Sequence, residues 1–119
     1  MRTFEYQLVT NGNMNATITS APQQVGQMVM ACVQAVFTGS SPTGTFKIQV
    51  SNNHKEYPPS NDVITDGDWT DYTGSEYAIT ASGSYVWNFA TLPFPFFRVV
   101  YTRVSGTGTL QVYVNGKGV

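Results

Sequence analysis

Four aspartates stand close together in the segment DVITDGDWTD, where oxygen ligands for a hard cation would be available. They are Asp62, Asp66, Asp68 and Asp71. Calcium binds carboxylate and carbonyl oxygens, but the spacing departs from the helix-flanked Asp-x-Asp-x-Asp-Gly loop and no flanking helix is expected. The Asp66-Gly67 pair is explained more simply as a turn. We therefore expect no bound metal, and calcium remains an open alternative for this segment.

Acid–base or nucleophilic catalysis would have to use His54, because the sequence contains one histidine and one cysteine. A Ser/His/Asp or Cys/His site needs an oriented imidazole beside its nucleophile, whereas His54 lies in an expected loop. Cys32 has no second cysteine for an intrachain disulfide, and we expect it to be a small buried side chain. Transition-metal sites need several His or Cys ligands. We expect no enzymatic activity and no cofactor.

The charge of the chain argues against nucleic acid and membranes as partners. The 119 residues carry 6 Lys and Arg against 7 Asp and Glu, for a net charge of −1. Such a weak field does not hold a phosphate backbone or an anionic membrane. No stretch approaches the roughly 18 apolar residues of a membrane span. The N-terminus also lacks the apolar region of a signal peptide, so we expect no export by a cleaved signal.

The elements that must position these residues are strands. Alternation of β-branched and aromatic residues with period two is found throughout, and no segment shows helical spacing. Turn residues lie between the strands, as at 39–42 and 105–108. The pattern predicts an all-β fold: one antiparallel β-sandwich domain over residues 1–119, with seven or eight strands and an immunoglobulin-like or jelly-roll order. The expected strands are 2–9, 15–19, 26–37, 44–51, 76–80, 84–89, 96–104 and 108–114.

Two of these strands, 26–37 and 96–104, are apolar on both faces. A sandwich buries one face of each strand, so the second face needs another cover. Covering it would contribute roughly 1.5 to 3 kcal/mol per large side chain. A loop of the same chain is one candidate cover, but we expect a neighbouring subunit to provide it and therefore expect a homo-oligomer. The rows in question include Val29, Val33, Phe96 and Val100.

Residues 92–97, LPFPFF, join a strand to its successor. Pro93 and Pro95 cannot donate hydrogen bonds to a sheet, so this segment is expected to be a bridge or edge with Phe94 and Phe96 at its surface. Aromatic side chains on a rigid edge suit a contact between proteins.

The longest irregular stretch, 52–75, is acidic, and six of the seven acidic residues lie between positions 56 and 76. Loops of this length in compact domains usually bind or cover something. We expect it to reach outward to basic groups of a neighbour, and a solvated loop is the alternative. With the 92–97 segment it supplies the candidate contact residues for a partner protein: Phe94, Phe96, Arg98, Val100, Asp66, Asp68 and Trp69.

A carbohydrate is the alternative ligand, because sandwich lectins stack sugars on exposed aromatic rings. Tyr85, Trp87 and Phe89 share one face of their strand and are expected in the core. The candidate exposed rings are Trp69, Tyr72, Tyr57 and Tyr113.

Several sequence words occur in a familiar order. They are VQAVFTGSSPTGTFKIQVSNN, then Trp69, then GSYVWNF and FRVVYTRVSGTGTLQVYVNGKG, and they cover about residues 33–118. This succession resembles a class of small virion proteins of tailed bacteriophages. The segment between His54 and Trp69 is longer here than the corresponding loop of that class.

The resemblance implies an accessory structural β-sandwich, such as a capsid decoration or cement protein, or a part of the neck or tail. Its partners would be other virion proteins, namely major capsid or tail and neck subunits, and further copies of itself. Its location would be the virion, after synthesis in the cytoplasm of the bacterial host. The alternative function is a carbohydrate-binding module that recognises a host receptor.

Overall fold

The computed structural model describes residues 2–54 and 67–118, and their regular structure is entirely β. The eight strands belong to one antiparallel sheet, which confirms the predicted all-β class. These described residues include no helix that is long and apolar enough to cross a membrane. The strands are β1 (Arg2–Asn13), β2 (Ile18–Thr19), β3 (Gln23–Gln24), β4 (Met30–Ser51), β5 (Thr70–Asp71), β6 (Tyr77–Ile79), β7 (Gly83–Phe89) and β8 (Phe96–Gly118).

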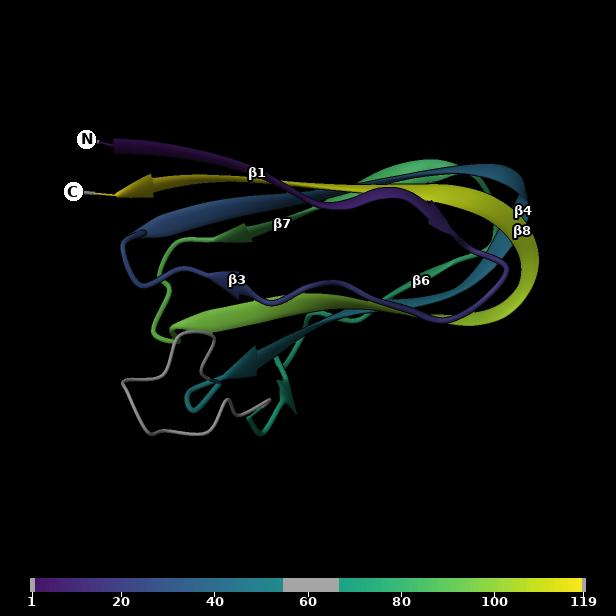
Figure 1. The fold of residues 1–119 in the computed structure, drawn as a ribbon. Coiled ribbons are helices and arrows are strands. Elements are labelled where there is room, and N and C mark those ends of the chain that lie inside the picture. The colour runs from purple at the N-terminus through teal and green to yellow at the C-terminus, as the bar shows by residue number, and fades with distance from the viewer. Residues whose placement is uncertain (1, 55–66, 119) are drawn as a thin grey trace.

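The long strands β4 and β8 pair with each other along their whole length and bend over together (Figure 1). The turns expected between separate strands at 39–42 and 105–108 are wrong, because these residues lie within β4 and β8, which stay paired with each other through the bend. Register shifts between Ser40 and Gly44 mark the bend. Gly106 lies beside it with a φ of 78°, and a Cβ at this position would collide with the carbonyl oxygen of Ser41. Glycine supplies the conformation that the bend requires.

The bend divides the sheet into two layers that face each other (Figure 1). The upper layer has the order β1, β8 (107–118), β4 (30–40), β7, and the lower layer has β2 and β3, β8 (96–105), β4 (43–51), then β5 and β6. Eight segments follow one another along the chain if β2 and β3 are counted as one, β5 and β6 as one, and β4 and β8 are each divided at the bend. The first segment pairs with the last, the second with the seventh, the third with the sixth and the fourth with the fifth. This nested order is that of a jelly roll, one of the two predicted alternatives. Both termini lie at the end opposite the bend, which we call the open end.

The core fills the space between the layers. The ring of Phe46 in the lower layer lies 6.0 Å from Trp87 in the upper layer, 5.4 Å from Phe37 and 4.8 Å from Tyr101, measured between centroids. Trp87 and Phe89 are buried, which confirms their predicted core position. The layers are therefore joined by aromatic packing as well as by two continuous strands.

The prediction that a neighbouring subunit covers the second apolar row of strands 26–37 and 96–104, with Val33 and Val100 in these rows, is wrong in part. Val33 is 0% exposed in the core, and Val100 is 7% exposed within the single chain. The outer row of β4 instead carries Met30, which is 41% exposed, and Cys32, which is only partly buried. Alternation shows that β4 has two apolar rows, but it does not show which row faces the core. Val33 belongs to the inner row, so the row left outside is the one with Met30 and Cys32.

Candidate functional site

The acidic segment leaves and rejoins the lower layer at the open end. Its two described arms are tied together by Asn53 and Asp68: the Asn53 Nδ2 donates to Asp68 Oδ2 at 2.9 Å, and the Asp68 amide donates to Asn53 Oδ1 at 2.7 Å. The expected irregular loop over 52–75 is also shorter than predicted, because β5 lies within it and pairs with β4. Asp66, one of the candidate contact residues, lies outside the described residues.

Beside this junction four side chains form what we call the aromatic–arginine cluster: His54, Trp69, Phe96 and Arg98. Phe96 and Arg98 lie two positions apart on the outer face of β8, and the two arms of the acidic segment supply His54 and Trp69. The His54 ring lies 4.8 Å from Phe96 and 5.5 Å from Trp69, and the Arg98 guanidinium carbon lies 4.4 Å from the Trp69 ring centroid. All four side chains are half-buried. Part of the outer row of β8 is thus covered by the same chain, and not by the neighbour that the sequence analysis expected.

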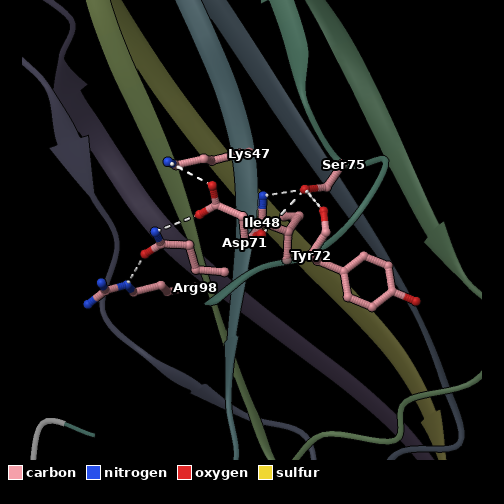
Figure 2. A network of polar contacts seen from close by, with 7 residues as sticks. Lys47, Ile48, Asp71, Tyr72, Ser75 and Arg98 are labelled. Carbon is pink, nitrogen blue, oxygen red and sulfur yellow. Dashed lines mark hydrogen bonds and ion pairs between the residues drawn. The ribbon is translucent and has the colours of Figure 1, made fainter. Parts of the chain in front are cut away.

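A line of polar contacts holds the cluster to β4 and β5 (Figure 2). The Arg98 Nε donates to Gln49 Oε1 at 2.9 Å, and the Gln49 Nε2 donates to Asp71 Oδ1 at 2.9 Å. The Lys47 ammonium lies 3.3 Å from Asp71 Oδ2. The hydrogen bond from Gln49, and then that from Lys47, lowers the pKa of the Asp71 carboxyl. Asp71 therefore has partners for its charge within the chain.

On the inner side of β5, Ser75 fixes the chain after the acidic segment (Figure 2). The Ile48 amide donates to Ser75 Oγ at 3.0 Å, and the Ser75 hydroxyl donates to the Tyr72 carbonyl at 2.6 Å. The Trp87 Nε1 donates to the Ser75 carbonyl oxygen at 2.8 Å and so connects the two layers. Sequence reasoning missed this buried serine, since nothing local separates it from an ordinary turn serine.

Two candidate contact residues are not at the surface. Phe94 is 5% exposed and packs 5.6 Å from the Tyr72 ring and 6.0 Å from the Phe89 ring, so its expected surface position is wrong, as it is for Val100. Of the predicted bridge or edge at 92–97, the structure shows the bridge, because residues 92–95 connect β7 to β8 outside any strand, whereas Phe96 begins β8 between β3 and β4.

The reason lies before β8, where the Pro95 carbonyl oxygen accepts a hydrogen bond from Val25 at 2.8 Å. This contact fixes the crossing at the open end, and Phe94 turns into the core. Of the predicted contact residues, Asp68, Trp69, Phe96 and Arg98 are brought together.

The described side chains give little support to calcium or sugar. Asp68 and Asp71 each bind other side chains, and no group of three His, Cys, Asp or Glu that could hold a metal occurs in residues 2–54 and 67–118. One face of the Trp69 ring carries Arg98, whereas the Tyr72 ring packs 5.4 Å from the core residue Phe89. These two rings therefore do not share a platform. Tyr57 lies outside the described residues.

Comparisons with known proteins give a fold and no family. No known protein family matches the chain, and no curated protein matches it. The crystal structure of the SPBc2 prophage-derived protein YomS is similar, with a TM-score of 0.55 and 12% identity over 97% of this chain and 94% of that chain. The structure of the infectious bursal disease virus Gx strain has a TM-score of 0.47 and 12% identity over 96% of this chain and 31% of that chain. The chain thus shares its overall fold with a prophage-derived protein.

Proposed function

We propose that this chain is a non-enzymatic structural protein of a tailed-bacteriophage virion, which acts by binding other virion proteins. The observation that carries the proposal is the similarity to prophage-derived YomS, which spans 97% of this chain and 94% of that chain. The sequence words in residues 33–118, which resemble small phage virion proteins, support the same assignment. Both arguments are analogies of fold and sequence, so the role must be tested at the particle.

The proposed role is capsid decoration or cementing, or an accessory position in the neck or tail. The aromatic–arginine cluster is the contact that we assign to the partner. Arginine and aromatic residues are enriched at protein interfaces and among the residues that dominate binding. The cluster is half-buried, so it presents part of each side chain while hydrogen bonds through Gln49 and Asn53 hold its surroundings. Such prior ordering reduces the entropy lost on binding.

The proposal is tested by mixing purified protein with emptied capsids and, separately, with tails of the phage that encodes it, prepared without this protein. We expect co-sedimentation with one of the two, and labelled protein at fixed positions in electron micrographs. Arg98→Ala is expected to weaken this binding by about fivefold or more, because truncating a residue that carries binding energy at an interface costs more than about 1 kcal/mol.

Val104→Ser is the matched control, since Val104 is 69% exposed on the same strand and outside the cluster. A thermal melt of each variant separates lost binding from lost folding. Wild-type protein that binds neither capsids nor tails contradicts the proposal, and a specific signal on a glycan array would favour the carbohydrate alternative.

A further inference from the structure

β7 forms one edge of the upper layer (Figure 1). It pairs with β4 from Phe89 opposite Ala31 to Gly83 opposite Phe37 and, in the part of the chain that the structure describes, with no other strand. An edge strand presents a row of backbone N–H and C=O groups that can pair with another chain. Proteins usually protect such edges with charges, proline, bulges or very short strands.

The other edge strands of this fold show these protections and β7 does not. β1 has register shifts after Gln7 and Val9 and carries the charged residues Arg2 and Glu5. β2, β3, β5 and β6 are two or three residues long. β7 has seven residues in unbroken register, and the sequence from 81 to 91, ASGSYVWNFAT, contains neither a charged residue nor proline.

The inward side chains of β7 fix its backbone. The Trp87 indole is hydrogen-bonded to the Ser75 carbonyl oxygen at 2.8 Å, and the Tyr85 ring stacks on Tyr77 at 3.7 Å between centroids. A strand held in this way loses little further freedom when it pairs. Val86, on the opposite face, is 39% exposed.

Within residues 2–54 and 67–118, the chain leaves this edge accessible. A hollow of about 420 Å³ runs beside β7, lined by residues 85–91 on one side and 72–75 on the other. Backbone groups of a second strand therefore have access to the edge.

We propose that β7 pairs antiparallel with β7 of a second copy of this chain, so that the two upper layers form one continuous sheet. Pairing centred on Val86 places Val86 opposite its own counterpart, Ser84 opposite Asn88 of the second copy, and Tyr85 opposite Trp87 of the second copy. The outer face then has an apolar pair flanked by two hydroxyl–amide pairs, and no like charges meet. This self-complementarity favours a second copy over an unrelated strand, and the contact is closed by a two-fold axis.

The inference deepens the proposed function and rests on it for the idea that the chain works by contact with copies of itself and with other virion proteins. It names the surface and the geometry of the contact between copies. The aromatic–arginine cluster lies on the outer face of the lower layer, so binding to the particle and pairing through β7 use different surfaces.

The test is the mass of the full chain in solution, measured by light scattering and sedimentation equilibrium over a wide concentration range. We expect wild-type protein to approach twice the 13.0 kDa of one chain. In the Ser84→Lys/Asn88→Lys variant, lysines of the two copies face each other, and the dissociation constant should rise at least tenfold. The Ser84→Asp/Asn88→Lys variant places opposite charges at the same positions and should dimerise at least as well as wild type. Thr10→Lys, on the opposite edge, is the matched control and should leave the mass unchanged.

The inference is overturned if wild-type protein stays at 13.0 kDa, if the double-lysine variant dimerises like wild type, or if the Asp/Lys variant is monomeric. Particle binding is measured on the same samples. A wild-type protein that stays monomeric but still binds the particle refutes the β7 contact alone, whereas a monomeric wild type that binds no particle refutes the proposed function as well. A monomeric wild type whose particle binding is abolished by the double-lysine change would identify a strand of another protein as the occupant and so overturn the second-copy assignment.

Discussion

Replacing Tyr101 by Phe should stabilise the protein, because it removes a buried hydroxyl that has no hydrogen-bond partner in residues 2–54 and 67–118. Tyr101 lies in β8, is 0% exposed and packs against the ring of Phe46 at 4.8 Å. Among the residues that the structure describes, none is within hydrogen-bonding reach of its Oη. The ring contacts stay in place after the substitution, and only the unsatisfied polar atom is lost.

The expected gain follows from the cost of burying such a group. An unpaired hydroxyl in a protein interior costs about 1 to 3 kcal/mol, and the small void left by one oxygen offsets part of the gain on its removal. We therefore expect the free energy of unfolding to rise by about 1 kcal/mol, which for a domain of this size raises the melting temperature by about 4 °C.

The assay is urea and thermal unfolding near neutral pH, followed by tryptophan fluorescence. Tyr113→Phe is the matched control, because Tyr113 is 39% exposed, so loss of its hydroxyl should change the stability by close to zero. Tyr101→Ala should lower the stability by about 3 to 5 kcal/mol, since it empties the core of a large ring.

The same hydroxyl should also affect the stability of the protein at alkaline pH. Burial raises the pKa of Tyr101, and the nearby charge of Arg103 opposes this in part. The folded state thus favours the neutral side chain. The difference in pKa leaves the free energy of unfolding unchanged below the unfolded pKa of about 10, and the protein loses stability as the pH rises from there through the higher folded pKa. Tyr101→Phe should remove this alkaline loss. If Tyr101→Phe instead lowers the stability by more than about 1 kcal/mol, the hydroxyl has a partner and the reasoning is wrong.

Two further substitutions test the bend and the polar line behind the aromatic–arginine cluster. Gln49 and Lys47 lower the pKa of Asp71, so the contribution of this carboxylate to stability is present above the unfolded pKa of about 3.9 and is lost as the pH falls through the folded pKa. Asp71→Asn should therefore flatten the acid branch of the stability profile, measured by fluorescence. An unchanged acid branch would contradict the assignment. Gly106→Ala should lower the free energy of unfolding in urea by about 1 to 3 kcal/mol, because it adds strain at a positive φ beside a carbonyl oxygen. Gly26→Ala should not, because its added Cβ meets nothing within 4 Å. Equal effects of the two substitutions would contradict this account of the bend.

Sequence patterning predicted the strands well, and it failed where long-range pairing decides the outcome. Alternation located the inward residues of β7, because Trp87 and Phe89 share one parity and a sheet face needs nothing else. The stretches at 39–42 (GSSP) and 105–108 (SGTG) have the composition of reversing turns. They become a paired bend only because β4 and β8 lie side by side on both sides of it, at positions far apart in the chain.

The candidate site was predicted as residues and not as an arrangement. Trp69 and Arg98 were both named, but the stacking between them depends on the return of the acidic segment to β8, which no local pattern encodes. Phe94 was misplaced because flanking prolines indicate an irregular segment without specifying which way a side chain turns. Gln49 was not named as a site residue from the sequence, because its bond to Asp71 requires β5, which is too short to leave a pattern of its own.

The nested pairing of the strands affects how the protein is made. Arg2 at the start of β1 lies opposite Gly118 at the end of β8. The outermost pair of the upper layer therefore cannot form until β8 has left the ribosome, and each inner pair closes a smaller loop. Assembly dominated by such distant contacts is slow compared with that of locally connected folds. During this delay the uncharged segment 81–91 is exposed. Incompletely folded copies are therefore most prone to associate with one another before the sandwich closes.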